Sequence, residues 1–277
     1  PVLAALAALA LGSCGTPGPG AADGGGPDGN RVPDGSLVPD GSFMPDADTA
    51  GGLPHKGDFL TNPSCSWGTT FYPTASASER ATCRAAIRSR GYTHIYLSVT
   101  SDTHDFYGNA SGFVGLLEEL VNDGIRPVVW LTSDTGVWKD RPIADIQSDL
   151  SAFIPQVDGL VASYCLGIEI DEYWTVSEAG VIANHLHSLS SKLVAAHQLS
   201  GQWNYCESGW CDYMILQYPF DQSESFVIDM TTQAIAALGK PVVAGEYNLN
   251  QPESVSVRLG DAAVFAGAAG FGNGGTP

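Results

Sequence analysis

Residues 240–248 have the sequence KPVVAGEYN, a short apolar run that begins after a lysine and ends in an acid. Similar runs occur at 94–100 (HIYLSVT), 126–132 (RPVVWLT) and 212–218 (DYMILQY). Short apolar runs rich in β-branched and aromatic residues are typical of buried strands. Such runs alternate with helical patterns throughout 65–275, which favours βα units and a parallel sheet.

Together with the segments between them, these runs predict a regular alternation of strands and helices. Eight strands are expected at 66–72, 94–100, 126–132, 165–171, 201–205, 212–218, 240–245 and 268–272. Helices are expected at 76–89, 111–122, 142–154, 177–197, 223–237 and 252–266, and glycines that suit a helix end follow at Gly91, Gly124, Gly239 and Gly267. This alternation predicts an α/β fold, a compact (β/α)8 TIM barrel preceded by a disordered N-terminal segment.

The first 56 residues differ in composition from the rest. Residues 2–11 form a short apolar run that leads to Gly-Ser-Cys14, which is typical of a secretory signal and resembles the lipobox of bacterial lipoproteins, in which this cysteine carries lipid. The following segment is rich in Gly, Pro and Asp and buries too little apolar surface to fold. We predict a lipoprotein signal over 1–14, a disordered linker over 15–56 and one barrel domain over 57–277.

The charge of the chain limits its partners. It has 30 Asp and Glu against 12 Lys and Arg, a formal charge of −18, and 24 of the acids follow residue 56. So negative a surface repels phosphate backbones and anionic lipid headgroups. We therefore expect no nucleic-acid partner, and membrane contact only through the N-terminal lipid. The location predicted is the bacterial cell envelope, by lipid anchoring, or the exterior by secretion.

Cysteine use agrees with export. Cys206 and Cys211 flank a short polar loop and predict a local disulfide, and Cys65 with Cys83 is a second candidate pair. Cys165 lies in an apolar run and is expected to be a buried free thiol.

Polar residues gather directly after the predicted strands. In a (β/α)8 barrel, the groups that do chemistry lie where strands run into the following loops. We predict two catalytic carboxylates there, Glu172 and Glu246. The predicted substrate-binding residues are Asp102, His104, Asp134, Asp171, Trp174, Asn204, Gln217, Tyr218 and Tyr247. We expect no cofactor and no metal; a metal-dependent hydrolase that uses Asp102, His104 and Asp134 is a weaker alternative.

The expected fourth strand carries three acids. With a period of two, Glu169 and Asp171 point into the barrel, whereas Glu172 comes where a bend turns it over the mouth. We interpret Glu169 as part of a buried polar network with Ser98, Thr132 or Gln202, and Glu172 as functional.

The ends of the fourth and seventh strands face each other across a barrel mouth, which pairs Glu172 with Glu246. Two carboxyl groups ~5 Å apart form the catalytic pair of a retaining glycosidase, whereas a larger separation implies an enzyme that inverts the anomeric configuration. Tyr247 or Tyr218 is expected to hydrogen-bond the nucleophile.

The stretches GIEIDE (167–172) and KPVVAGEYN (240–248) resemble the clan A glycoside hydrolases, the cellulase-like family-5-type barrels. The resemblance implies Glu172 as the acid/base, Glu246 as the nucleophile, and a poly- or oligosaccharide as substrate for a monomeric enzyme. The chain lacks that clan's strand-two Arg and strand-eight Trp, so a barrel that binds glycans without cleaving them is an alternative.

A second resemblance is to the chitinases of family 18. It rests on Glu169 and Asp171 alternating on strand four and on 214–218 (MILQY). It implies substrate-assisted hydrolysis of N-acetylated sugars, but Tyr173 stands where that family has its catalytic Glu and Glu246 has no role.

Overall fold

A curled sheet of parallel strands organises the protein. The computed structural model describes residues 72–101, 104–132, 138, 140–246 and 253–274. The sheet has seven strands in the order β1-β4-β5-β6-β7-β8-β9, and every pairing in it is parallel. They are β1 (His94–Ser98), β4 (Arg126–Trp130), β5 (Ser163–Cys165), β6 (Val194–His197), β7 (Tyr213–Gln217), β8 (Val242–Glu246) and β9 (Gly270–Gly274). Beyond β1, β2 (Thr100–Ser101) and β3 (His104–Asp105) form a small antiparallel ribbon.

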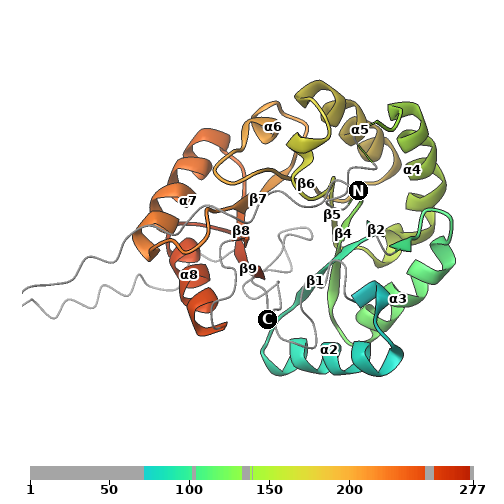
Figure 1. Cartoon of the computed structure of the whole chain (residues 1–277), viewed down its shortest axis with the longest axis horizontal. Coiled ribbons are helices and arrows are strands. Elements are labelled where there is room, and N and C mark those ends of the chain that lie inside the picture. The colour runs from blue at the N-terminus through green and yellow to red at the C-terminus, as the bar shows by residue number, and fades with distance from the viewer. Residues whose placement is uncertain (1–71, 102–103, 133–137, 139, 247–252, 275–277) are drawn as a thin grey trace, which may run out of the picture. The chain divides into compact units, whose positions relative to one another are not determined.

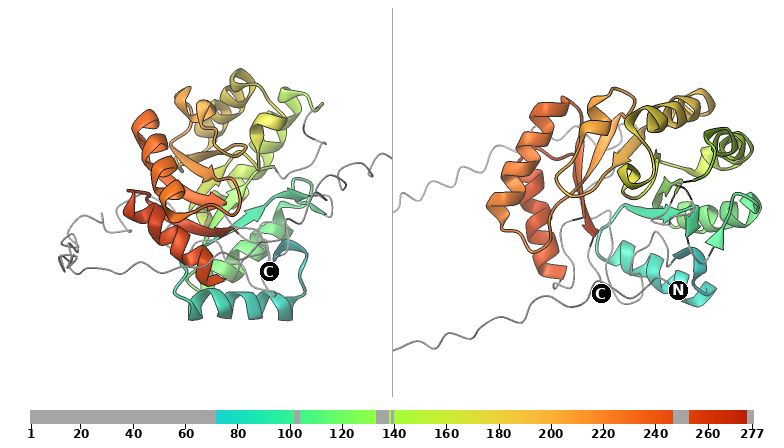
Figure 2. Two further views of the ribbon diagram at one scale, coloured as in Figure 1. Left: turned by 60° about the vertical axis from the view of Figure 1, so that its left-hand side comes forward. Right: turned by 45° about the horizontal axis from the view of Figure 1, so that its top comes forward.

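Helices cover the outside of the curl. They are α2 (Ala77–Ser89), α3 (Ala110–Asn122), α4 (Ile143–Val157), α5 (Val176–Leu189), α6 (Asn204–Glu207), α7 (Glu224–Leu238) and α8 (Glu253–Phe265). The short 3-10 helices η2 (Asp158–Leu160) and η3 (Ile170–Glu172) complete the set. Figure 1 shows the strands around a common centre with the helices at the periphery, and the turned views of Figure 2 show the same arrangement. This is the (β/α)8 TIM-barrel architecture that the sequence predicts.

Local sequence signals fix where the helices begin and end. Ser76 and Thr175 each accept a hydrogen bond from the amide of a glutamate three residues on, whose carboxylate accepts one from the cap amide in return. The glycines expected to end helices all have positive φ: Gly91, Gly124, Gly239 and Gly267.

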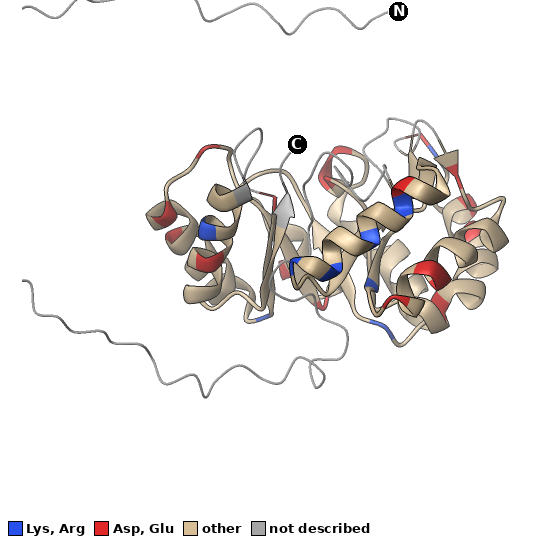
Figure 3. Ribbon diagram, turned by 90° about the horizontal axis from the view of Figure 1, so that it is seen from below, with Lys and Arg blue, Asp and Glu red and all other residues tan. Residues whose placement is uncertain are grey.

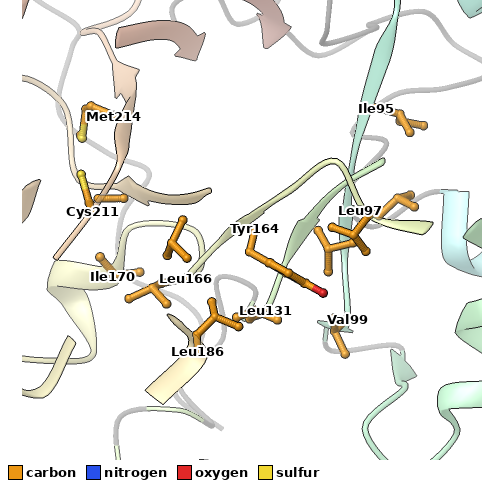
Figure 4. Close-up of a cluster of buried hydrophobic side chains, with 14 of the residues drawn as sticks. Ile95, Leu97, Val99, Leu131, Tyr164, Leu166, Ile170, Leu186, Cys211 and Met214 are labelled. Carbon is orange, nitrogen blue, oxygen red and sulfur yellow. The ribbon is translucent and has the colours of Figure 1, made fainter. Parts of the chain in front are cut away.

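The core has two parts because alternate strand residues face opposite sides of the sheet. On β1, Ile95 and Leu97 belong to the large cluster between sheet and helices, part of which Figure 4 shows. Tyr96 between them belongs to a smaller cluster inside the barrel, with Trp130, Cys165 and other residues. The barrel interior is therefore a packed layer, and the polar residues lie above it at the carboxyl ends of the strands.

One strand and the end of one helix are predicted wrongly. The fifth strand is not 201–205 but β6 (Val194–His197), and the helix expected over 177–197 ends at Leu189. The Ser190-Ser191 pair ends the helix, and Leu193 to Ala196 supply the apolar strand.

The fourth strand is shorter than expected. It ends at Cys165 rather than continuing to Asp171, and the chain turns into η3 instead. The first expected strand, 66–72, lies outside the described residues except for Tyr72.

Ion pairs join the first two described helices. Arg80 and Arg84 of α2 bind the Glu119 carboxylate of α3, and Arg84 also binds Asp123. Figure 3 shows the basic positions spaced along α2. The hydrogen bond from Arg80 lowers the pKa of Glu119 below its ordinary value.

The structure describes four of the cysteines for which the sequence makes a prediction. Cys206 and Cys211 form the expected disulfide, and the ammonium of Lys240, just before β8, donates to both their carbonyl oxygens. Cys165 is a buried free thiol, as expected. Cys83 is disulfide-bonded, whereas Cys65 lies outside the described residues.

None of the described helices is long and apolar enough to cross a membrane. The predicted signal, the lipidated Cys14 and the linker all lie outside the described residues.

Candidate active site

Four polar residues from four consecutive strand ends meet at one point of the barrel. Glu169 follows β5, His197 ends β6, Gln217 ends β7 and Glu246 ends β8. Because the strands are parallel, their carboxyl ends lie at the same edge. Hydrogen bonds, strand pairing and one short contact connect the four residues, as described below.

Glu246 is held rigidly at the end of β8. It is 9% exposed, and its backbone carbonyl accepts a 2.7 Å hydrogen bond from the Tyr218 amide. The β7–β8 register shifts at Leu216/Gln217 so that Glu246 pairs with Gln217. Gly245, just before it, has to be a glycine, because a Cβ there would overlap Ile215 Cγ2 inside the barrel. The strand thus leads Glu246 to the mouth through a position where no side chain fits.

Glu169 has an unusual backbone. Its φ is +46° and its ψ is 52°, in the left-handed region that residues other than Gly, Asn and Asp seldom occupy. Such a conformation costs roughly 1–3 kcal/mol and persists only where surrounding contacts impose it. Two hydrogen bonds do so: its amide donates to His197 Nδ1 at 3.1 Å, and its Oε1 accepts from Gln217 Nε2 at 2.8 Å.

Gly167 sets the approach to that turn. A Cβ on Gly167 would overlap Thr132 Oγ1, the hydroxyl that donates a buried 3.0 Å hydrogen bond to the Leu166 carbonyl. The close passage of the chain over Thr132 therefore places Ile168 and Glu169 over the barrel.

His197 lies between the two glutamates. Its ring is fully buried, 4.9 Å from the Trp130 ring, and its Nε2 is 3.7 Å from Glu246 Oε2. Burial lowers the pKa of His197 to about 3, so the ring is neutral at neutral pH and its contact with Glu246 is dipolar rather than ionic.

Glu172 and Asp171 are placed differently from the sequence prediction. Glu172 is exposed, at the end of η3, and its amide donates to the Glu169 carbonyl. Among the described residues, none forms a hydrogen bond or ion pair with its carboxylate. Asp171 accepts a 3.0 Å hydrogen bond from the Leu199 amide and thereby holds the loop after β6. The acid that reaches the strand-end cluster is Glu169, which we interpret from sequence as a structural residue.

Tyr218 lies away from the mouth. It is fully buried, with its hydroxyl 2.8 Å from Thr231 Oγ1 of α7. The Tyr218 hydroxyl therefore bonds a residue on the helix side of the sheet and not one at the mouth, where the sequence predicts it.

The structure describes only some of the remaining predicted substrate-binding residues. His104 is half-buried in the β2–β3 ribbon and bonds Ser101 Oγ and the Ser98 carbonyl. Trp174 is buried, and exposed Asn204 accepts from Gln198 Nε2. Asp102, Asp134 and Tyr247 lie outside the described residues.

Sequence reasoning missed His197 because it placed this residue on a helix. The Ser-Ser pair before Lys192, followed by an apolar run, is the signal for a strand that ends at the histidine. Within the described ranges, no group of three or more His, Cys, Asp and Glu is placed to hold a metal ion.

Comparison with known proteins gives similarity at the level of fold. No family model matches the chain, and no curated protein matches it in sequence. Among solved structures, one from Bacteroides vulgatus, provisionally described as a glycoside hydrolase, matches with a TM-score of 0.62 and 11% identity over 81% of this chain. The match covers 51% of that protein, so this chain spans about half of its length.

Other similar structures have defined activities. The mannanase catalytic domain of Streptomyces sp. SirexAA-E has a TM-score of 0.55 at 12% identity, with 79% of this chain and 74% of that chain covered. The Thermobifida fusca endoglucanase, solved with cellotetraose, has 0.54 at 11%, with 79% and 78% covered. The carboxyl transferase domain of Rhizobium etli pyruvate carboxylase, with different chemistry, reaches 0.50 at 12%, with 79% and 40% covered.

These similarities define the fold class. The chain has a (β/α)8 barrel fold similar to that of these glycoside hydrolases. At these identities the fold does not determine the reaction, so the activity has to be argued from the site.

Proposed function

We propose that this domain is a glycoside hydrolase that cleaves a poly- or oligosaccharide with retention, through Glu169 and Glu246. The observation that carries the proposal is that Glu169 and Glu246 share two neighbours, Gln217 and His197, at the carboxyl ends of the strands. Gln217 bonds Glu169 and pairs with Glu246 across β7 and β8, and His197 contacts both residues. Glu169 thus replaces Glu172 as the partner of Glu246.

Burial favours a division of roles. The acid/base must exchange protons with water between the two steps, and Glu169 is partly exposed in its turn. The nucleophile must be held in place beneath the sugar ring, and Glu246 is buried at the end of β8. This assignment matches the strand order of the clan that the sequence resembles.

The reaction has two balanced steps. First, a Glu246 carboxylate oxygen bonds to the anomeric carbon as the glycosidic C–O bond breaks, and the departing oxygen takes the proton of Glu169. Second, Glu169 takes a proton from water, whose oxygen bonds to the anomeric carbon and releases Glu246 as a carboxylate. A strained, hydrogen-bonded turn at Glu169 fixes the donor for both steps.

The similar structures support a carbohydrate as the substrate. They are described as galactanases, mannanases and an endoglucanase, two of them solved with bound oligosaccharides. A neutral sugar also suits a chain with a charge of −18.

We further propose that the protein is a monomer, exported and anchored through lipid on Cys14. The support is the apolar run at 2–11 followed by Gly-Ser-Cys. Labelling cells with a clickable palmitate tests it: wild type is expected to be labelled and Cys14→Ala is not. An unlabelled wild type found in the medium contradicts anchoring but not export.

A matched set of variants tests the catalytic assignment. Turnover is measured on a panel of aryl glycosides and polysaccharides for Glu246→Gln, Glu169→Gln and the control Glu172→Gln. We expect Glu246→Gln to abolish turnover and Glu169→Gln to lower it on the order of 10²–10⁴-fold on polysaccharides. The loss for Glu169→Gln is expected to be smaller on aryl glycosides, whose leaving groups need little protonation.

The control separates the two candidate acids. Glu172→Gln is expected to keep wild-type turnover because its carboxylate is exposed and, among the described residues, has no hydrogen bond to Gln217, His197 or Glu246. If Glu172→Gln lost activity while Glu169→Gln did not, the assignment would be overturned. Equal glycan binding and no turnover by wild type and Glu246→Gln would instead identify a binding barrel.

A further inference from the structure

His197 makes a different contact through each ring nitrogen. On the Nδ1 side, the Glu169 amide donates a hydrogen bond. A backbone amide is only a donor, so Nδ1 has to be the unprotonated nitrogen. In a neutral imidazole the proton then lies on Nε2.

The Nε2 side faces the other glutamate. Nε2 is 3.7 Å from Glu246 Oε2, is buried, and has no hydrogen-bond partner among the described residues. The fixed tautomer therefore presents an N–H toward the carboxylate at a distance that a small rotation of the Glu246 side chain closes to a hydrogen bond.

The ring itself is immobilised. It is fully buried at the end of β6 and packs at 4.9 Å on Trp130, which belongs to the cluster inside the barrel. Among the described residues, the charged groups that contact it are Glu169 from the loop after β5 and Glu246 from β8. Gln217 of β7, which bonds Glu169, is neutral.

We propose that His197 is a positioning residue for the hydrolytic reaction, which holds the left-handed turn of Glu169 through Nδ1 and orients the Glu246 carboxylate through Nε2–H. The inference rests on the proposed function and goes beyond it, because it makes one neutral ring responsible for the alignment of both carboxyl groups. A neutral donor stabilises the carboxylate without adding a cation, so Glu246 remains able to bond to the anomeric carbon and to leave it again.

Two conservative substitutions separate the two contacts. His197→Asn keeps an acceptor near the Nδ1 position and loses the distal N–H, whereas His197→Gln places an amide N–H near the Nε2 position and loses the Nδ1 acceptor. His197→Phe loses both and keeps a ring to pack on Trp130.

The pH profile of kcat/KM is the readout that a packing role does not move. A carboxylate that loses a hydrogen-bond donor is protonated more easily, so the acidic limb of His197→Phe and His197→Asn is expected to shift upward by about one pH unit. His197→Gln is expected to restore the wild-type limb, and kcat/KM of His197→Phe to fall roughly 10²-fold. An unmoved acidic limb in an active His197→Phe protein overturns the inference and leaves the proposed function standing.

Nitrogen NMR of the wild-type ring tests the geometry without any substrate. We expect the His197 resonances to show the Nε2–H tautomer unchanged from pH 5 to 9. An Nδ1–H tautomer, or a ring that protonates in this range, overturns the inference. A wild type without hydrolytic activity on any glycan overturns the proposed function, and with it the catalytic role of His197.

Discussion

The contact between Gly167 and Thr132 gives a quantitative test of how the chain reaches Glu169. Gly167 does not have a positive φ, so Gly167→Ala costs energy through sterics alone. The new Cβ overlaps Thr132 Oγ1 and comes within 3.1 Å of both the Cβ and the carbonyl oxygen of Thr132. Overpacking of this kind costs roughly 1–3 kcal/mol, and rotation of the hydroxyl out of the way loses a buried hydrogen bond worth about 1 kcal/mol.

The single variant Gly167→Ala is therefore expected to lower the free energy of unfolding by about 2–4 kcal/mol. Thr132→Ala alone loses the hydrogen bond and a buried methyl group, about 2 kcal/mol together. In the double variant the Oγ1 overlap is gone and the hydrogen bond is lost only once, so the two costs do not add. We expect a coupling of about 1–2 kcal/mol that favours the double variant.

Urea unfolding followed by circular dichroism measures these values. The control is Thr132→Val, which keeps a group of similar volume in place of Oγ1, so Gly167→Ala in that background is expected to recover no stability. If the losses of unfolding free energy for Gly167→Ala and Thr132→Ala add to within about 0.5 kcal/mol in the double variant, the two residues are not in contact. The course of the chain described for 165–169 would then be wrong.

Three further variants test separate parts of the structure. Tyr218→Phe is expected to lose about 1 kcal/mol of stability with the Thr231 hydrogen bond and to keep wild-type kcat/KM; a loss of kcat/KM without loss of stability would return Tyr218 to the substrate site. Cys206→Ser is expected to lower unfolding free energy by about 2 kcal/mol, since its disulfide closes a short loop; an unchanged urea midpoint contradicts this. Because Arg80 lowers the pKa of Glu119, the ionised carboxyl group stabilises the fold above its unfolded pKa of about 4.3, and this stabilisation is lost as pH falls through the folded pKa. Arg80→Met is expected to lower the free energy of unfolding by under about 1 kcal/mol at pH 7 and to lose less stability than wild type on acidification. Parallel stability–pH curves for the two proteins would refute the linkage.

The sequence predicts most of the barrel because its signals are local. Short apolar runs rich in β-branched residues, such as 240–245, favour strands, and capping residues such as Ser76 and Thr175 mark helix starts. Glu246 is found for the same reason: it comes directly after an unambiguous strand.

The partner of Glu246 was harder to predict, because the period-two rule does not say where a strand stops. LGIEIDE continues to look like a strand after Cys165, but the close contact of Gly167 with Thr132 and the left-handed backbone at Glu169 end it. Those are long-range contacts, which the local pattern does not contain. His197 was missed for a related reason: the apolar run VAAH (194–197) is too short to be distinguished by pattern from the end of a helix.

The most direct test of the central claim is the distance between the Glu169 and Glu246 carboxyl groups in a crystal structure with an oligosaccharide bound. We predict about 5–5.5 Å, the separation of a retaining pair, with the glycosidic oxygen between the two groups. A separation beyond about 10 Å, or a sugar bound against Glu172 instead, would contradict the account.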